Sequence, residues 1–181
     1  EILVRVHAAG LNFKDVMHAL GLLPFAPAER CDSTQIFGFE CSGIVTAIGE
    51  RVSRFRSGDE VFGITTTGTL ASHARIQERF AFRRPSSLSP EDAGGVLVQF
   101  MTAHHALIDL ARVGHGERVL VHAATGGVGL AAIRMCRNVG AEIFATAGTS
   151  EKRAFLQSLG VRHVMDSRSL DFADRIREIT G

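Results

Sequence analysis

The sequence predicts an α/β protein with two parts, a partial, open β barrel followed by the first half of a doubly wound parallel sheet. In the first half of the chain, short apolar segments are separated by glycine turns, which is typical of small antiparallel barrels. After residue 117, strand-like and helix-like patterns alternate, as they do in right-handed parallel βαβ units. With 45% apolar residues among 181, the chain can bury two cores.

The amino-terminal part is predicted to be mostly strand. Alternating apolar residues indicate a strand over residues 2–7, and apolar runs flanked by glycine turns indicate strands over 43–49, 58–63 and 70–76. One helix is expected over 12–20, where the apolar residues share a face.

A break in composition separates the two parts. The prolines and serines of residues 85–90 interrupt the pattern, and an apolar helix is expected over 93–107. We therefore predict two domains, 1–88 and 89–181. Because the chain begins without an initiator Met and ends on a helical pattern that stops at Gly181, we expect a fragment of a longer polypeptide, hereafter the parent.

The carboxy-terminal part alternates strands with helices. Each predicted strand is paired with the helix after it: 119–122 with 128–139, 142–147 with 151–159, and 163–165 with 172–179. We expect the first strand to be buried on both faces, because its run over 119–121 is entirely apolar. A complete dinucleotide-binding sheet has two such halves, so the second half is expected in the parent.

The most informative segment is the turn after that first strand. An apolar strand runs into a turn dense in glycine, and helical spacing begins within the turn. Without side chains, backbone N–H groups and the positive end of the helix dipole can approach a pyrophosphate closely. The alternative is a merely tight strand-to-helix turn, but strand, turn, helix and second strand follow in the order that a phosphate cradle requires. We predict that the cradle is made by Ala124, Thr125, Gly126, Gly127, Val128 and Gly129.

The residues after the second strand indicate which dinucleotide is bound. An NAD enzyme places a carboxylate there to hold the ribose 2′-hydroxyl, and residues 144–148 contain none. Hydroxyl and cationic side chains suited to a 2′-phosphate follow, so we predict NADPH. The alternative for Lys152 and Arg153 is a solvated first helical turn, although cations there oppose the helix dipole. The candidates for this phosphate are Thr149, Ser150, Lys152, Arg153, Ser167 and Arg168.

Composition excludes several function classes. The net charge of +1 is spread along the chain, which argues against nucleic-acid binding. No apolar run approaches the ~18 residues that span a bilayer, and the first residues lack a signal-peptide pattern. Cys31, Cys41 and Cys136 lack the spacing of a metal site or a disulfide framework. We therefore expect no membrane partner and a cytoplasmic location.

Four segments together resemble the medium-chain dehydrogenase/reductase superfamily: Ala9-Gly-Leu-Asn-Phe-Lys-Asp15, Gly38-Phe-Glu-Cys-Ser-Gly43, Gly58-Asp-Glu-Val61 and His122-Ala-Ala-Thr-Gly-Gly-Val-Gly129. The resemblance implies a GroES-like substrate domain over 1–88 and a Rossmann NADPH-binding domain over 89–181, with substrate in the cleft between them. Zinc-dependent members use a cysteine and a Gly-His-Glu segment as ligands. Here Asn12 and Phe39 stand at the matching positions, so no metal site is expected.

Among zinc-free members, the sequence is most similar to the enoyl reductase domains of polyketide and fatty acid synthases. Residues 11–21, 123–132 and Ser167-Arg-Ser-Leu-Asp-Phe172 carry this resemblance. It implies reduction by NADPH of the α,β-double bond of an enoyl thioester on an acyl carrier protein. Neighbouring synthase domains are the implied partners, and the parent could be a homodimer. His104-His105 departs from the family's aromatic pair, and the loop over 24–36 is longer than expected.

The resemblance also implies residue roles. Lys152 and Asp171 match a lysine and an aspartate proposed to act near the protonation site, while Asn12 would contact the nicotinamide or the thioester and Thr102 the cofactor. Each has a structural alternative. Lys152 could instead hold the 2′-phosphate, Asp171 could be the N-cap of the last helix, Asn12 could cap its own helix, and Thr102 could bond back within its helix.

The remaining polar candidates are interpreted as structural. His104 and His105 are adjacent and are expected on different faces of a helix, and His122 is expected to be a satisfied core residue. Cys41 is expected to pack in the barrel.

Two other functions stay open. A free-standing NADPH:quinone or alkenal oxidoreductase would use the same hydride chemistry on a small electrophile, and a non-catalytic relative would bind the nucleotide only. On its own, the fragment is expected to be inactive.

Overall fold

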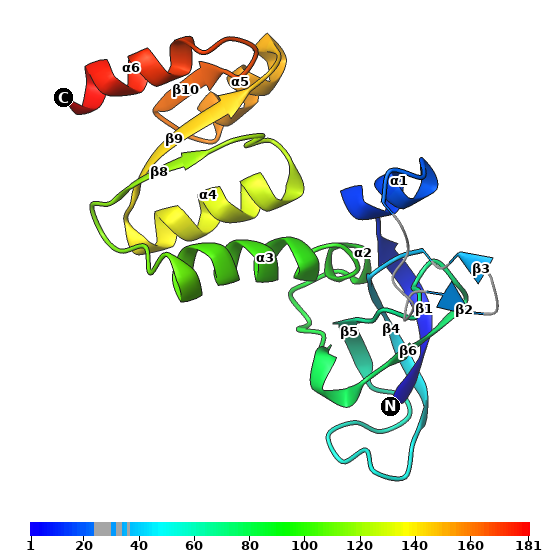
Figure 1. The fold of residues 1–181 in the computed structure, drawn as a ribbon. Coiled ribbons are helices and arrows are strands. Elements are labelled where there is room, and N and C mark those ends of the chain that lie inside the picture. The colour runs from blue at the N-terminus through cyan, green and yellow to red at the C-terminus, as the bar shows by residue number, and fades with distance from the viewer. Residues whose placement is uncertain (24–29, 32–33, 36) are drawn as a thin grey trace. The chain divides into compact units, whose positions relative to one another are not determined.

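The computed structural model describes residues 1–23, 30–31, 34–35 and 37–181. These residues form two compact units, Glu1–Val98 and Gln99–Gly181, which Figure 1 colours from blue to red along the chain. Most of the loop that the sequence suggests is unusually long lies outside the described residues, as does the side chain of Cys31.

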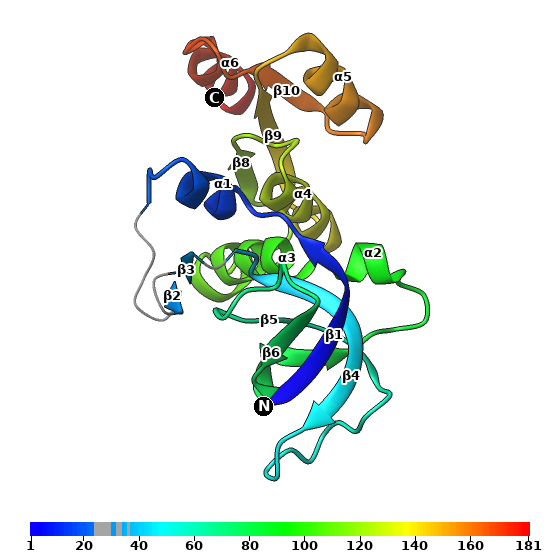
Figure 2. The ribbon, with the colours of Figure 1, turned by 90° about the vertical axis from the view of Figure 1, so that its right-hand side faces the viewer.

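The first unit is built on an open antiparallel sheet in the order β6-β1-β4-β5-β7. Its strands are β1 (Ile2–Gly10), β4 (Glu40–Ile48), β5 (Glu60–Ile64), β6 (His73–Ile76) and β7 (Ala81–Arg83). A separate small pair joins β2 (Arg30–Cys31) to β3 (Thr34–Gln35). The predicted strands are found with shifted ends, whereas β7 was not predicted. Figure 2 shows β1 and β4 lying side by side.

Strand periodicity explains the core of this unit. Ile2 and Val4 of β1 are buried, and Val4 pairs across the sheet with Val45 and Ala74. Cys41 is fully buried in the same cluster, so its predicted packing role is confirmed. Burying an aliphatic side chain such as that of Ile2 or Val4 contributes about 1.5–3 kcal/mol to folding stability before the loss of conformational entropy is counted.

The apolar helix predicted over 93–107 is confirmed from Leu97 onward, but its predicted start is wrong, because the chain breaks at Gly94. A short helix, α2 (Pro90–Ala93), ends there, and α3 (Leu97–His104) begins after it. A Cβ atom on Gly94 would lie 2.9 Å from the Ala8 side chain, so this junction approaches β1 too closely for another residue. Since α2 packs on β1 and β4, it belongs to the first unit, although the sequence placed the boundary at 88/89.

Two further helices complete the first unit. They are α1 (Phe13–Ala19), which corresponds to the helix predicted over 12–20, and the 3-10 turn η2 (Glu78–Phe80).

The second unit is a three-stranded parallel sheet in the order β10-β9-β8 with a helix after each strand. Its elements are β8 (Arg118–Val121), α4 (Gly127–Val139), β9 (Glu142–Ala147), α5 (Ser150–Ser158), β10 (His163–Asp166) and α6 (Asp171–Thr180). The predicted alternation is confirmed, with element ends within two residues of the prediction. In this register Ala147 pairs with Asp166, which brings the carboxyl ends of β9 and β10 together.

The expectation that the first parallel strand is buried on both faces is wrong. Val121 is 7% exposed, but Leu120 is 39% exposed. The reason is that adjacent residues of a strand point to opposite faces, and Val121 shares a core with α4 whereas Leu120 points away from that core. Ile133 of α4 and Ala145 of β9 belong to the core on that side.

Two expectations about histidines are corrected. After α3 the chain continues as a π-helix, η3 (His105–Leu110), whose wider turn brings His104 and His105 to the same carboxylate. Their Nδ1 atoms lie 3.5 and 3.2 Å from the oxygens of Asp109. His122 is exposed rather than in the core, although its Nδ1 lies 2.9 Å from the Thr146 hydroxyl.

Among the described residues, no helix combines the length and apolar character needed to span a bilayer.

Candidate functional site

The turn between β8 and α4 is held against the sheet by backbone hydrogen bonds. Ala123 adopts a positive φ of 48°, and the Ala124 N–H donates to the Thr146 carbonyl of β9 at 3.1 Å. The Gly126 N–H donates to the Ala123 carbonyl at 2.8 Å, which closes the turn. The buried Ala124 is thereby anchored directly above the strand ends.

Glycine is required at position 129 for close packing. A Cβ atom there would lie 2.7 Å from both the Ala123 carbonyl oxygen and the Ala124 Cα, and these are backbone atoms that cannot move aside. The first turn of α4 therefore touches the cradle itself. Position 126 is less crowded, since the nearest atom would be 3.2 Å away.

The helix start leaves donors available for an anion. The Leu130 N–H makes the first helical bond, to the Gly126 carbonyl at 2.9 Å, and no side chain caps the helix at Gly126. The N–H groups of Gly127, Val128 and Gly129 precede that bond and add to the positive end of the helix dipole. These features, with the closely packed Gly129, fit a pyrophosphate.

Local hydrogen bonds occupy the hydroxyls after β9. Thr149 is the N-cap of α5, and its hydroxyl accepts from the Lys152 N–H at 3.3 Å. The Ser150 hydroxyl donates to the Glu151 carboxylate at 3.2 Å. Hydrogen bonds from its own backbone N–H and from the Thr149 and Ser150 side chains hold the pKa of Glu151 below its ordinary value. Glu151 is thus an anion beside the predicted phosphate site.

The basic residues of this region have different neighbours. Arg153 Nη1 lies 2.9 Å from an Asp166 carboxylate oxygen and donates to the Ala147 carbonyl at 3.2 Å. Arg168 covers Gly148, where a Cβ atom would lie 2.8 Å from the Arg168 Nε. The Lys152 side chain is exposed, and its ammonium has no partner within the described ranges. Lys152 and Arg168 are therefore the cations whose charge is least offset by an acidic neighbour, and they are best able to bind a phosphate.

Asp166 is the residue that sequence reasoning missed. Its carboxylate pairs with Arg153 and also accepts from the Arg168 backbone N–H at 2.8 Å. The signal was present, because an acid at the end of one parallel strand meets the end of its neighbour. Asp166 therefore orients the Arg153 side chain and offsets its charge, and it fixes the backbone of Arg168.

The interpretation of Asp171 as an N-cap is wrong. Leu170 is the N-cap and has helical backbone angles, so Asp171 is the first residue of α6. The Ser169 hydroxyl donates to the Asp171 carboxylate at 2.9 Å. Asp171 lines a depression of about 430 Å³ that Asp174 also lines. In the described part of the chain, no contact joins the side chains of Lys152 and Asp171.

Asn12 lies in the first unit between two buried carboxylates. It is the N-cap of α1, and its backbone N–H donates to the Asp15 carboxylate at 2.9 Å. Its side-chain amide donates to Glu40 Oε1 at 3.1 Å. The second Glu40 oxygen accepts from the Val98 N–H at 2.9 Å, at the start of α3. The amide is therefore held in a defined orientation.

The role of Glu40 was not foreseen, because the segment Gly38-Phe-Glu-Cys-Ser-Gly43 was interpreted only as a family motif that lacks the zinc-binding histidine. Its side chain is fully buried, and a Cβ atom on Gly10 would lie 2.7 Å from the Glu40 Cγ. Burial, together with the Glu40 charge, raises the pKa of Cys41 to about 12, so the thiol stays protonated. Asp15, in contrast, could have been found from its spacing of three from Asn12, which is that of a capping box.

Two further predictions concern Thr102 and the absence of a metal site. Thr102 is exposed on α3, three residues after Gln99. Within the described ranges, no group of three or more His, Cys, Asp or Glu side chains could hold a metal ion. Phe39, which stands where zinc enzymes have histidine, has the Lys14 ammonium 4.5 Å from its ring centre.

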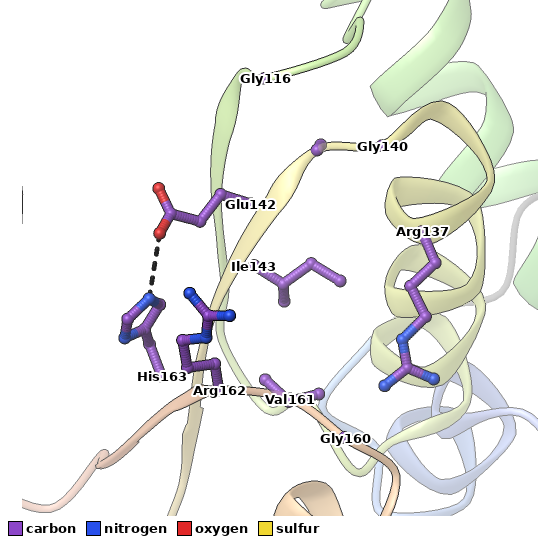
Figure 3. A pocket seen from close by; sticks show the side chains of 10 residues that line it. Gly116, Arg137, Gly140, Glu142, Ile143, Gly160, Val161, Arg162 and His163 are labelled. Atoms are coloured by element: carbon purple, nitrogen blue, oxygen red, sulfur yellow. Dashed lines mark hydrogen bonds and ion pairs between the residues drawn. The ribbon is translucent and has the colours of Figure 1, made fainter.

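Another depression, of about 440 Å³, lies at the opposite edge of the parallel sheet (Figure 3). It is lined by Arg137, Arg162, Glu142 and His163, and His163 Nε2 lies 3.0 Å from Glu142 Oε1. That hydrogen bond is the main reason why the pKa of Glu142 is below its ordinary value. Nucleotides bind at the carboxyl ends of parallel strands, and this depression borders the amino ends.

Two family models cover most of the chain. Residues 1–112 match the family described as alcohol dehydrogenase GroES-like domain, and residues 127–181 match zinc-binding dehydrogenase. A mycocerosic acid synthase-like polyketide synthase of Mycobacterium tuberculosis is 41% identical over 182 aligned positions, which cover 100% of this chain and 8% of that protein.

Solved structures show the same likeness. CurK enoyl reductase superimposes with a TM-score of 0.91 at 44% identity, and the match covers 99% of this chain and 55% of that one. Escherichia coli quinone oxidoreductase complexed with NADPH gives a TM-score of 0.86 at 31% identity, covering 99% and 54%. The chain thus spans about half of these structures and a small fraction of the synthase.

Proposed function

This chain belongs to the medium-chain dehydrogenase/reductase family, and on that premise we propose that its parent is an NADPH-dependent, zinc-independent enoyl reductase. The substrate is the α,β-unsaturated acyl thioester carried by an acyl carrier protein in a polyketide or fatty acid synthase. The observation that carries the proposal is the glycine-dependent cradle at the start of α4, in a chain 44% identical to a solved enoyl reductase.

The cofactor would supply a hydride when bound. The backbone N–H groups of Gly127, Val128 and Gly129 would hold its pyrophosphate. Thr125 and the backbone of Gly126 would border the same anion. A 2′-phosphate would be held after β9 and β10 by the basic and hydroxyl side chains there, foremost Lys152 and Arg168, with Thr149, Ser150, Arg153 and Ser167 around them. Thr102 of α3 is proposed to contact the cofactor as well.

Asn12 is proposed to act on the substrate. A side-chain amide has two N–H donors, and Glu40 accepts one of them. The second donor can bond a thioester oxygen, where negative charge develops during reduction. Because Glu40 is buried and also bonded to the Val98 N–H, the amide is oriented before substrate arrives.

Lys152 and Asp171 are proposed as groups near the protonation site. Lys152 is exposed, so it is able to serve either the 2′-phosphate or a proton relay. Asp171 is bonded to the Ser169 hydroxyl, which leaves its second carboxylate oxygen for a water molecule. The chain contains no tyrosine, so no tyrosine of this chain donates the α-proton.

A quinone oxidoreductase is the second candidate, favoured by the likeness to the Escherichia coli enzyme. A substrate comparison separates the two. The purified parent is given NADPH with a crotonyl thioester of an acyl carrier protein or of pantetheine, and separately with a small quinone. The proposal expects thioester reduction to be much the faster. Quinone reduction alone would establish the second candidate, and NADPH binding without turnover on either would indicate a non-catalytic relative.

A further inference from the structure

A polar side chain next to the cradle has an unmet hydrogen bond. In the described part of the chain, the Oε1 atom of Gln99 is buried and accepts no hydrogen bond. A buried acceptor that is left unpaired destabilises the folded state, so a folded protein keeps one mainly where a ligand completes it. Gln99 stands on the first turns of α3, three residues before Thr102.

The orphaned amide touches the cradle directly. A Cβ atom on Gly127 would lie 2.6 Å from Gln99 Cγ and 3.5 Å from its Nε2. Gly127 is the first residue of α4, and its N–H is one of the donors proposed for the pyrophosphate. The Gln99 side chain therefore borders the place where the nucleotide would pass, and Figure 1 shows α3 running beside α4.

The chemistry of an acceptor selects the part of the nucleotide it can meet. A pyrophosphate has no donor at neutral pH, so it cannot satisfy a carbonyl oxygen. The donors of the dinucleotide are the ribose hydroxyls, the nicotinamide carboxamide and the adenine amino group, and the last of these belongs to the adenosine half. The adenosine ribose is assigned to residues after β9, beside Thr149, Lys152 and Arg168, whereas Gln99 contacts the turn after β8.

We propose that the Gln99 amide is a ligand of the nicotinamide half of the bound dinucleotide, its carbonyl oxygen accepting from a ribose hydroxyl or the carboxamide. The inference rests on the proposed nucleotide site and adds a residue to it. Gln99 thereby selects for an intact dinucleotide over its adenosine fragment.

Binding to two ligands tests this in the parent. NADPH affinity is measured by fluorescence titration, and adenosine 2′,5′-bisphosphate, which lacks the pyrophosphate and the nicotinamide half, by calorimetry. Gln99→Met keeps the length of the side chain and its contact with Gly127. We expect NADPH to bind about three- to tenfold more weakly, adenosine bisphosphate to bind unchanged, and the melting temperature to stay equal or rise. Gln157→Met, at an exposed position of α5, is the control and should alter nothing.

The contrary outcomes are distinct. Unchanged NADPH affinity with a higher melting temperature would show that the orphaned oxygen is only a packing defect and would overturn the inference. An equal loss of affinity for NADPH and for adenosine 2′,5′-bisphosphate would also overturn it, because the substitution would then disturb the whole nucleotide site and not the nicotinamide half alone. If wild-type parent binds neither ligand, the proposed function fails as well. Should Gln99→Met not fold, Gln99→Glu replaces it and is expected to weaken NADPH selectively, and unchanged affinity would again refute the assignment.

Discussion

Three basic side chains, those of Lys152, Arg153 and Arg168, follow β9 and β10. They differ in whether an acidic side chain already pairs with them. Arg153 is paired with Asp166, whereas the Lys152 ammonium is exposed and Arg168 lies over Gly148 at the strand end. We therefore propose that binding of a 2′-phosphate depends mainly on Lys152 and Arg168. Arg153 acts chiefly through its bond to the Ala147 carbonyl, which supports the end of β9.

We predict that Lys152→Ala or Arg168→Ala in the parent weakens NADPH binding by about ten- to a hundredfold, because each substitution removes a charge-assisted hydrogen bond to the 2′-phosphate. NADH lacks the 2′-phosphate and should change by less than about twofold. The measurement is a titration of each variant with both nucleotides. Arg162→Ala removes an exposed cation at the amino edge of the sheet and is the matched control. Equal losses for NADPH and NADH would remove these residues from the phosphate site.

Among the glycines at the start of helix α4, Gly129 is the one that close backbone packing requires most. A side chain at position 129 would collide with backbone of Ala123 and Ala124, whereas position 95 has no atom closer than 3.8 Å. Gly129→Ala is predicted to lower the free energy of unfolding by about 1–3 kcal/mol and to abolish measurable nucleotide binding. Calorimetry of the parent with and without NADPH reports both quantities. Gly95→Ala should preserve both, and a Gly129→Ala variant that binds normally would refute the cradle.

An ion pair joins the turn before β5 to β7. Arg83 Nη1 lies 2.8 Å from the Asp59 carboxylate, and the Arg56 N–H donates to it at 2.9 Å. The hydrogen bond from Arg83 is the largest cause that lowers the pKa of Asp59 below its ordinary value.

A group with a lowered pKa in the folded state stabilises the protein above its unfolded pKa, here ~3.9. That stability is lost as the pH falls through the lower, folded value. Asp59→Asn is therefore predicted to lower the melting temperature at neutral pH and to flatten its decline below about pH 4. The melting temperature of the parent is followed against pH, with Glu50→Gln as an exposed control for the charge change. Parallel curves for wild type and Asp59→Asn would contradict the assignment.

Local pattern predicted the elements well, because strand and helix periodicities depend on near neighbours. The helices and strands around the cradle were therefore placed to within two residues. Contacts between residues that are far apart in the sequence could not be predicted from local pattern. The break at Gly94 depends on the approach of Ala8, and the exposure of Leu120 depends on which face of β8 packs on α4. The pairing of Arg153 with Asp166 depends on register between strands.

For the whole molecule, the resemblance inferred from short motifs is matched by relatives that cover nearly the entire chain. The match covers about 8% of the length of the Mycobacterium tuberculosis synthase and 55% of the CurK enoyl reductase chain. The described residues contain the proposed cradle and the Asn12 amide that Glu40 orients. The carrier-bound substrate, the neighbouring synthase domains, a homodimeric assembly and a cytoplasmic location remain predictions about the parent.

The most direct measurement follows the transferred hydrogen. The parent is incubated with NADPH deuterated at C4 on the transferring face and with a crotonyl thioester, and the product is analysed by mass spectrometry and NMR. We predict a butyryl thioester with one deuterium at the β-carbon and a solvent-derived hydrogen at the α-carbon. A saturated product without deuterium at the β-carbon, or an unreduced thioester alongside competent NADPH binding, would contradict it.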